Sequence, residues 1–433
     1  MWRKFIGFSA LAGVFIGGAA LLPVESDTDR RFEGLGDIRV FSEPQASEVS
    51  AFLIYPYGEG ANPFAEGLMH YVEHLVAASV WDVGGEDAMR HSNAWTNQFS
   101  TGYWGKGQSQ DLPDILQALV QSAAPFDMAP EFASSERKIV QREYDFRNFG
   151  QAMTVINREI EDKLYGNQAW SRSVIGTPQD IAQFSYEDAV VLHQRSHRLE
   201  DAVLLLFGDV SKGDVFDALE AISTPSAAAV SALDPVDWSI EVTPMRQHAG
   251  QSLKGDAGPD VIYRKIVQTS VCGQDFACDV RLGLLENILD SAMEGGIAGP
   301  LRFDAFLAQS FRFHLAHLGQ GQVEISFSAS LDEGVSRKEL LSTFESILED
   351  RLTSGFLVES FERVKKRGLL GANDKLFSAK QKFDAALSWA QSGMPIPGLL
   401  AENRVYDAIT LEELNGLARE LAAPGRVVVR NLY

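Results

Sequence analysis

The chain has 433 residues, enough for two or three domains that each enclose a hydrophobic core. Apolar residues make up 45% of it and charged residues 22%, proportions that are typical of a soluble globular protein. Its 59 acidic residues outnumber 38 basic residues and give a net charge of −21, which argues against nucleic acid as a partner.

The N-terminus has the pattern of an export signal. A basic start at Arg3 and Lys4 precedes an uninterrupted run of apolar and small residues, Phe5–Leu22, and Gly18–Ala20 offers a cleavage zone. We therefore expect residues 1–22 to form a cleaved signal peptide, with an uncleaved membrane anchor as the alternative. Both interpretations predict an exported protein, periplasmic or extracellular, whose only membrane contact is Phe5–Leu22.

Two strands and a helix are predicted next. Asp37–Phe41 and Val49–Tyr55 have the composition of strands, and the second lies in an alternating stretch before a loop of Gly, Pro and Asn. Phe64–Trp81 carries Leu, Met and Val at helical spacing, which predicts a helix that is mostly buried.

This helix contains the sequence His70-Tyr71-Val72-Glu73-His74. A helix places residues four apart on one face, so both imidazoles can reach the same ion, and Glu73 leans toward that side. Neutral imidazole suits Zn²⁺, and the order His-x-x-Glu-His is an inverted zinc-peptidase motif. A surface helix with two solvated histidines is the alternative, but the apolar helix around them favours a metal site. We predict that His70 and His74 bind zinc and that Glu73 is the general base.

Five further elements of the first half are predicted. They are an extended stretch, three helices and a buried strand, at Asn93–Trp104, Leu112–Ala123, Glu131–Asn148, Tyr186–Arg195 and Asp201–Phe207. Residues 223–237 combine small residues with proline and lack basic residues, as is typical of a linker. We predict an N-terminal domain at residues 30–222 and a C-terminal domain at residues 238–433.

The second half repeats the order of elements in the first. A strand and two helices are predicted at Gln322–Ser330, Arg337–Arg351 and Leu357–Leu370. They follow the order and spacing of Phe99–Lys106, Leu112–Ala123 and Glu131–Asn148. The chain is therefore predicted to be a duplicated α+β domain.

The metal-binding residues are not repeated with the elements. The positions equivalent to His70, Glu73 and His74 carry Glu286, Leu289 and Asp290. The position equivalent to Glu143 carries Leu369. If these residues had only a structural role, we would not expect all four to be replaced together in the second copy. We predict one metal-binding copy and one copy without ligands.

The chain has two cysteines, Cys272 and Cys278, on either side of a turn that contains glycine. In an oxidising compartment a local disulfide is expected, and two free thiols are the alternative. No histidine lies near them in the sequence, so we assign them no catalytic role.

A third zinc ligand is expected on an element that faces the histidine helix. Glu136 and Glu143 are two helical turns apart and therefore share one face of the helix at Glu131–Asn148. Spacing alone leaves two interpretations open, a metal-binding face or a solvated charged helix.

Three motifs together resemble the pitrilysin family of inverted-zincin metallopeptidases, whose members include insulin-degrading enzyme and mitochondrial processing peptidase. The motifs are Gly67–His74, the segment Asn93–Thr96, and Glu136–Glu143. The resemblance implies that Glu143 is the third zinc ligand and that Glu136 supports the site by hydrogen bonding. It also implies two homologous domains, each a mostly antiparallel sheet packed with helices, that form half of a peptidase chamber.

The resemblance extends to a substrate-binding strand, with one departure elsewhere. Asn93, Ala94 and Thr96 match an edge strand on which a peptide pairs as an added strand, while ordinary sheet residues are the alternative. An Arg and a Tyr that usually reach over the substrate are absent, since Phe306 and Phe313 stand at those places.

From these residues and this resemblance we expect a zinc endopeptidase that hydrolyses peptides or unfolded segments. Its expected partners are peptide substrates and a second subunit, in a homodimer or in a heterodimer with a paralogue. The missing Arg and Tyr leave a second expectation open, a non-catalytic or weakly active peptide-binding subunit of a heterodimeric peptidase.

Overall fold

The computed structural model describes residues 32–430, apart from residues 33, 82–90, 149–151, 167–168, 226–229, 250–257, 274–275 and 399. The predicted signal peptide or anchor, residues 1–22, lies outside the described residues. Within the described part of the chain, every helix is too short or too polar to cross a membrane.

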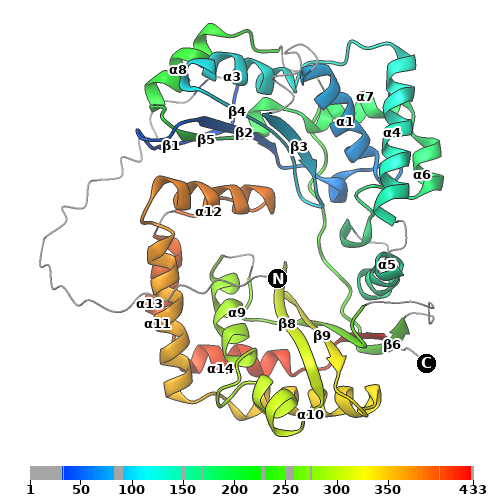
Figure 1. The fold of residues 1–433 in the computed structure, drawn as a ribbon, viewed down its shortest axis with the longest axis vertical. Coiled ribbons are helices and arrows are strands. Elements are labelled where there is room, and N and C mark those ends of the chain that lie inside the picture. The colour runs from blue at the N-terminus through cyan, green and yellow to red at the C-terminus, as the bar shows by residue number, and fades with distance from the viewer. Residues whose placement is uncertain are drawn as a thin grey trace, which may run out of the picture. The chain divides into compact units, whose positions relative to one another are not determined.

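The first half forms a five-stranded sheet in the order β1-β5-β2-β4-β3 (Figure 1). Its strands are β1 (Asp37–Ser42), β2 (Val49–Tyr55), β3 (Ser92–Thr96), β4 (Thr101–Gly107) and β5 (Val203–Gly208). β1 and β5 are parallel, and the other neighbours are antiparallel. Leu53, Ile54 and Tyr55 of the central strand β2 are all buried, although successive side chains point to opposite faces. Both faces of this sheet are therefore covered.

The second half forms another five-stranded sheet, in the order β6-β10-β7-β9-β8. Its strands are β6 (Met245–Ala249), β7 (Val261–Gln268), β8 (Ala308–Gly319), β9 (Gln322–Leu331) and β10 (Arg426–Arg430). β6 and β10 are parallel, and the other neighbours are antiparallel. Order and direction match the first sheet strand for strand, which confirms the predicted duplicated α+β fold with mostly antiparallel sheets.

The first half contains the helices α1 (Leu68–Trp81), α3 (Leu112–Gln121), α4 (Pro130–Asn148), α5 (Ala152–Tyr165), α6 (Pro178–Gln183), α7 (Tyr186–Ser196) and α8 (Lys212–Ala221). All of these except α5 build one core with the first sheet. Apolar side chains on one face of four of them, including Leu75, Leu116, Leu192 and Leu219, are fully buried in this core. The same face of the sheet therefore supports α1 and its neighbours (Figure 1).

The second half contains the helices α9 (Phe276–Leu289), α10 (Arg337–Ser354), α11 (Val358–Asp374), α12 (Ala379–Gln391), α13 (Ala401–Ala408) and α14 (Leu411–Leu421). All of these except α12 build one core with the second sheet. Short helical turns also occur, at Glu59–Ala61, Ser109–Asp111, Ala169–Ser171, Leu199–Asp201 and Gly299–Asp304. The hydroxyls of Ser336 and Thr410 cap α10 and α14 by accepting hydrogen bonds from backbone N–H groups.

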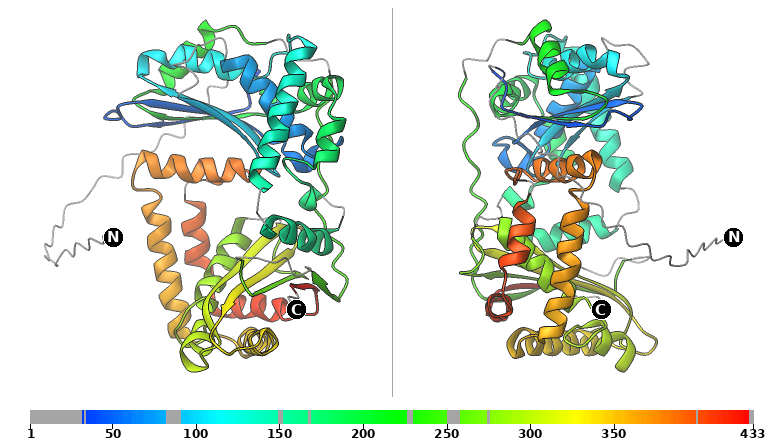
Figure 2. Two further views of the ribbon diagram at one scale, coloured as in Figure 1. Left: turned by 45° about the vertical axis from the view of Figure 1, so that its right-hand side comes forward. Right: turned by 90° about the vertical axis from the view of Figure 1, so that its left-hand side faces the viewer.

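Each half also contributes one helix to the sheet of the other half (Figure 2). α12, from the second half, packs against β1 and β5, and its Phe383 shares a core with Leu205. α5, from the first half, packs against β6, β7 and β10 through Ile160 and Leu164. The sequence patterns did not predict either helix. These two helices cover the faces of the sheets that the other helices leave open.

A buried polar cluster joins α5 to the second sheet. Arg264 of β7 donates to both carboxylate oxygens of Glu324 on β9, at 2.5 and 2.9 Å. Tyr165, the last residue of α5, donates to the same carboxylate. Because Glu324 is only 5% exposed, its charge needs these partners to be tolerated in the interior.

Two sequence predictions differ from the structure in their bounds. The helix expected from Phe64 begins at Leu68, because Gly67 has a φ of +86°, outside the helical range. The extended stretch Asn93–Trp104 is a hairpin rather than one strand. Its turn is held by Asn97, whose Oδ1 accepts from the N–H groups of Phe99 and Ser100 at 2.7 and 2.8 Å.

The predicted linker, residues 223–237, has no helix or strand in its described residues, 223–225 and 230–237. This agrees with a connecting segment. The domain bounds at residues 222 and 238 stay a prediction.

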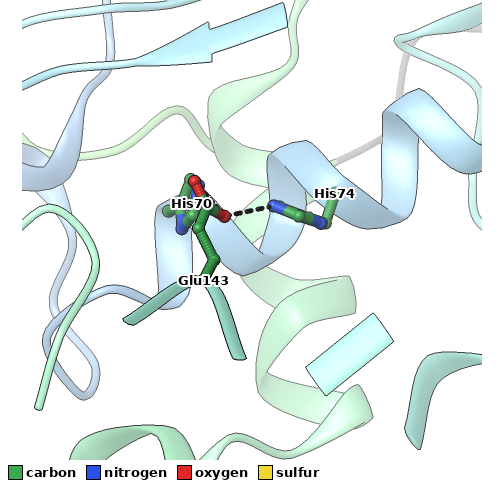
Figure 3. Close-up of side chains that lie close together, drawn as sticks. All are labelled: His70, His74 and Glu143. Carbon is green, nitrogen blue, oxygen red and sulfur yellow. Dashed lines mark hydrogen bonds and ion pairs between the residues drawn. The ribbon is translucent and has the colours of Figure 1, made fainter. Parts of the chain in front are cut away.

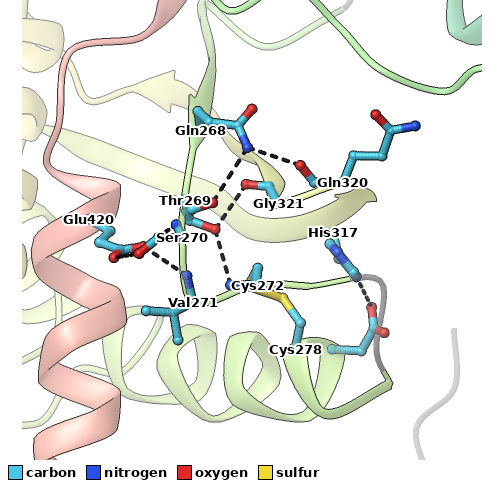
Figure 4. Close-up of a disulfide and its surroundings, with 11 residues drawn as sticks. Gln268, Thr269, Ser270, Val271, Cys272, Cys278, His317, Gln320, Gly321 and Glu420 are labelled. Atoms are coloured by element: carbon cyan, nitrogen blue, oxygen red, sulfur yellow. Dashed lines mark hydrogen bonds and ion pairs between the residues drawn. A yellow bond between two sulfur atoms is a disulfide. The ribbon is translucent and has the colours of Figure 1, made fainter.

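Cys272 and Cys278 are joined by a disulfide, as one of the two interpretations of the sequence expected (Figure 4). The bond connects the segment after β7 to the first turn of α9, and both cysteines are buried. Neighbouring hydrogen bonds fix the same segment, since Ser270 and Val271 donate their backbone N–H groups to Glu420 of α14. The disulfide therefore stabilises the entry to α9.

Candidate metal centre

The helix α1 presents its histidines from a nearly buried position. Leu68, Met69 and Val72 pack into the core around them, so His70 is only 5% exposed and Glu73 only 9% exposed. The hydroxyl of Tyr71 donates to the carbonyl oxygen of Ala133 at 2.6 Å and fixes α1 to α4. A buried cluster of imidazoles and carboxylates needs partners, because an unpaired polar group in the interior is costly.

The helix α4 brings Glu143, which the family resemblance implied as the third ligand, close to the two histidines (Figure 3). Glu143 Oε2 lies 3.5 Å from His70 Nε2 and 3.3 Å from His74 Nε2. One ligand atom from each of the three residues lies within 4.8 Å of the other two. Among the described residues these three form the one group of three or more His, Cys, Asp or Glu with such spacing.

Two neighbours orient these ligand atoms. Glu136, the other member of the predicted pair, places its Oε2 3.5 Å from His74 Nδ1, which leaves His74 Nε2 to face Glu143. Arg147 forms an ion pair with Glu143 Oε1, which leaves Glu143 Oε2 to face the histidines. Sequence reasoning missed Arg147, although its position one turn after Glu143 is the signal that could have identified it.

The donor set fits a zinc ion. Ligand atoms bound about 2.1 Å from one tetrahedral ion lie roughly 3.4 Å apart, close to both separations of Glu143 Oε2 from the imidazole nitrogens. Burial lowers the pKa of His70 to about 3, with the nearby His74 and Arg147 adding to the effect, so its imidazole is neutral and able to bind metal. Two imidazoles and one carboxylate would leave the fourth coordination position of a tetrahedral zinc ion free, which is typical of catalytic zinc sites.

Glu73 stands beside this group without belonging to it. Burial raises the pKa of its carboxyl to about 7, while the Thr96 hydroxyl and His74 act in the opposite direction. Its Oε2 is buried and has no hydrogen-bond partner among the described residues. A carboxylate with these properties is suited to accept and return a proton near neutral pH.

The three residues predicted to bind substrate lie together on β3. Asn93, Ala94 and Thr96 belong to this strand, which is the last in its sheet and pairs on one side with β4. Asn93 is exposed, and its Oδ1 accepts from the N–H of Ala94 at 2.8 Å. The strand β3 packs against α1, the helix that carries Glu73.

The equivalent place in the second half holds no comparable group among the described residues. Glu286 of α9 instead accepts hydrogen bonds from the His314 ring, at 2.8 Å, and from the N–H of Leu315, at 2.9 Å. Leu289 is fully buried in the core. The second copy therefore uses these positions for packing and strand contacts.

Phe306 and Phe313, which stand where an Arg and a Tyr were expected, have different environments. Phe313 lies on β8 and is 5% exposed, so it belongs to the core. Phe306 precedes β8, is 62% exposed and has a φ of +51°. Neither side chain can donate a hydrogen bond.

No family model matches the chain. Several curated proteins are similar in sequence over part of their length, and two of them illustrate the match. The zinc protease PqqE of Helicobacter pylori is 21% identical over 227 residues, which cover 50% of this chain and 51% of that protein. The human mitochondrial-processing peptidase subunit beta is 24% identical over 162 residues, which cover 35% of this chain and 32% of that protein. The chain thus spans about half or less of these relatives.

Solved structures share the fold over most of the chain. A protease from Helicobacter pylori superposes with a TM-score of 0.72 at 17% identity, covering 89% of this chain and 94% of that one. An inactive domain of an M16 peptidase from Pseudomonas fluorescens gives a TM-score of 0.71 at 11% identity, covering 92% and 96% of the two chains.

The duplicated α+β fold is therefore shared with solved structures that include a protease and an inactive M16 peptidase domain. The chain is similar in sequence to these peptidases and in fold to pitrilysin and M16-type proteins, the family that the three sequence motifs resemble.

Proposed function

We propose that the protein is a zinc-dependent endopeptidase that hydrolyses peptides or unfolded segments. The observation that carries the proposal is the convergence of His70, His74 and Glu143 beside Glu73. The names of the sequence relatives, a zinc protease and a processing peptidase subunit, support it.

In this proposal His70, His74 and Glu143 hold zinc, and Glu136 fixes the orientation of His74. A bound zinc ion would supply Lewis acidity and lower the pKa of a coordinated water. Glu73 removes a proton from the attacking water and later delivers it to the leaving amine. The buried position of Glu73 supports this role, because a carboxyl with a pKa of about 7 can perform both transfers.

Substrate is proposed to pair with the free edge of β3. Main-chain pairing on an edge strand binds an extended peptide with little dependence on its sequence. Asn93, Ala94 and Thr96 lie on this strand, which packs against the helix that carries Glu73. A peptide added to β3 would therefore run past the candidate base.

The working form is proposed to contain a second subunit, either another copy or a paralogue. Support comes from the duplicated fold and from a relative that is itself named as a subunit. We also propose that the protein is exported to the periplasm or the extracellular space. The pattern of residues 1–22 and the disulfide of Cys272 with Cys278 support export, because disulfides persist in oxidising compartments.

The test measures zinc content and the cleavage of an unstructured peptide by the purified protein, with and without a chelator. Glu73→Gln is expected to retain one zinc per chain and to lose activity by about 10²–10⁴-fold, since it removes the proton acceptor. Glu286→Gln, on the equivalent helix of the second half, is the matched control and should be as active as the unaltered protein. Full activity of Glu73→Gln would contradict the assignment of the base.

A second candidate function is a non-catalytic or weakly active peptide-binding subunit of a heterodimeric peptidase. It is favoured by Phe306 and Phe313 at the places of the expected Arg and Tyr, and by the likeness to an inactive M16 domain. Zinc bound one to one without cleavage of any peptide in a mixed pool, until a paralogous subunit is added, would favour this alternative.

A further inference from the structure

The two histidines of the candidate metal centre are held in different ways. Glu136 Oε2 lies 3.5 Å from His74 Nδ1, whereas His70 Nδ1 is buried and has no hydrogen-bond partner among the described residues. A metal-binding histidine is usually oriented by a hydrogen bond at its other ring nitrogen. His70 lacks this support and is the third residue of α1, so the position of its Nε2 depends on where the helix begins.

Arg172 fixes the segment that leads into α1. Its Nε donates to Glu59 Oε1 at 3.1 Å, and its Nη2 donates to the carbonyl oxygen of Phe64 at 2.7 Å. Asn62 Nδ2 also donates to Glu59 Oε1, at 2.9 Å, and to the carbonyl oxygen of Ala65, at 2.8 Å. These hydrogen bonds hold the backbone shortly before the helix begins.

Arg158 of α5 fixes the next part of the same segment. Its Nη2 donates to Glu66 Oε2 at 2.6 Å, and the N–H of Ser173 donates to the same oxygen at 3.1 Å. Gly67 then turns the chain into α1 at a φ of +86°. It lies so close to Ile175 that an added Cβ would be 2.4 Å from the carbonyl carbon of that residue. The entry to α1 therefore has little freedom to shift.

The buried pair of Glu59 and Arg172 is not needed merely to connect β2 with α1. Glu59 is 0% exposed, so its carboxylate is separated from water and needs the guanidinium as a partner. Replacing a buried ion pair by apolar residues of similar volume is often neutral or even stabilising. The pair is therefore better explained by the backbone geometry that it fixes than by the stability that it adds.

We propose that Arg158 and Arg172 are positioning residues of the candidate metal centre, which fix the entry to α1 and thereby hold His70 Nε2 within reach of Glu143 Oε2. The inference rests on the proposed zinc site but not on peptidase activity. Because α5 packs against β6, β7 and β10, Arg158 also connects the metal centre to the sheet of the other half.

The test measures the affinity of the whole protein for Zn²⁺ by competition with a chromogenic chelator, and the unfolding of the metal-free protein in urea. Arg158→Gln is expected to bind Zn²⁺ about tenfold more weakly, because Glu66 loses the charged donor that fixes it. Arg172→Lys keeps a positive charge beside Glu59 but cannot reproduce the forked contact with Glu59 and Phe64, so a similar loss is expected. The visible absorption of the Co²⁺-loaded protein, which depends on ligand geometry, should change in both variants.

Arg246→Gln is the matched control. Arg246 of β6 forms an ion pair with Glu345 of α10 at 2.6 Å, and this pair is partly exposed like that of Arg158 with Glu66. The control should lose a similar amount of stability in urea while keeping the affinity for Zn²⁺ and the Co²⁺ spectrum of the unaltered protein.

Three outcomes would overturn the inference. Unchanged Zn²⁺ affinity in Arg158→Gln and Arg172→Lys would overturn it alone and leave the zinc site intact. An equal loss of affinity in Arg246→Gln would show that the loss follows from lower stability rather than from the position of α1. Absence of Zn²⁺ binding by the unaltered protein would overturn the zinc site as well. If Arg172→Lys does not fold, Arg158→Gln decides, because its ion pair is partly exposed.

Discussion

At the scale of single residues, the candidate metal centre depends on which atom of each side chain is left free. Glu136 occupies His74 Nδ1, and Arg147 occupies Glu143 Oε1. The remaining atoms, His74 Nε2 and Glu143 Oε2, face each other and His70 Nε2. The orientation of the ligands is therefore built into their neighbours before any ion arrives, which lowers the conformational cost of binding.

This arrangement predicts separate effects for a ligand and for its support. His70→Ala should lose bound zinc, and Glu136→Gln should weaken zinc binding by about 10–100-fold, since it no longer fixes the His74 ring as firmly. Competition with a chromogenic chelator measures both. Glu131→Gln, exposed on the same helix, is the control. Unchanged affinity in Glu136→Gln would show that Glu136 has no part in the site.

A second prediction at this scale concerns pH. The pKa of His193 falls from its ordinary value of 6.5 to about 4 on burial, and that of His197 is also lowered. Between pH 4 and pH 6.5 the unfolded chain therefore binds more protons than the folded chain. The contribution of these histidines to the free energy of unfolding is present above pH 6.5 and is lost as the pH falls toward 4. His193 alone should make the protein about 2 kcal/mol less stable at pH 5 than at pH 7.

Urea unfolding at the two pH values measures this difference. In His193→Gln the difference in the free energy of unfolding between pH 5 and pH 7 should be smaller, because glutamine does not titrate. An unchanged pH dependence in that variant would mean that other groups determine the acid sensitivity.

At the scale of single elements, the two copies of the domain show which features the site requires. Gly67 precedes α1 at a φ of +86°, and a Cβ there would collide with the backbone of Ile175 and Gly176. Its sequence counterpart Gly283 lies inside α9, where a Cβ would meet nothing within 4 Å. Only the first copy needs glycine, because only there does the chain turn sharply into the helix that carries the ligands.

Gly67→Ala should therefore destabilise the protein by roughly 1–3 kcal/mol, through backbone strain and the collision. Gly283→Ala is the matched control and should be neutral or stabilising by about 0.5–1 kcal/mol, because alanine is the better helix former. Denaturant unfolding compares the two variants. Equal effects in both would contradict the role assigned to Gly67.

The disulfide acts on one element, the first turn of α9. Replacing both cysteines by alanine should cost about 2 kcal/mol, the chain-entropy estimate for closing a loop this short. A reducing agent should destabilise the unaltered protein by a similar amount and leave the double variant unchanged, because the chain has two cysteines. A double variant as stable as the unaltered protein would mean that the surrounding hydrogen bonds suffice.

Elements that carry their own pattern were predictable from the sequence, and elements defined by distant contacts were not. Val49–Tyr55 has its predicted bounds because alternation and the following loop are local signals. α5 and α12 were missed because their apolar faces meet the sheet of the other half, which periodicity does not reveal. In the site, spacing and the family resemblance together predicted the His-His-Glu group. Arg147 was missed, although it follows Glu143 by one helical turn, because a charged residue on a charged helix has no distinctive sequence pattern.

At the scale of the whole molecule, the exchanged helices couple the cores of the two halves. Phe383 of α12 lies between rings of the first sheet, with centroids 5.9 Å from Phe41, 5.4 Å from Phe52 and 5.7 Å from Phe207. A substitution in the second half can therefore loosen strands of the first.

Phe383→Ala should destabilise the protein by about 3–5 kcal/mol, as expected for removing a buried aromatic side chain. Hydrogen–deuterium exchange should also rise in β1 and β5, although neither strand is near position 383 in the sequence. Phe377→Ala removes a side chain that is 89% exposed and is the matched control, with no expected effect on either measurement. A rise in exchange confined to α12 would show that the cores are independent.

The helix exchange also limits how the chain can be divided. A fragment that ends near residue 222 keeps α5 but lacks the sheet that buries Ile160 and Leu164, and its own sheet lacks α12. Produced alone, such a fragment would expose these apolar surfaces to water and aggregate. Two fragments made together should instead assemble without a covalent connection, as each supplies the helix that the other lacks.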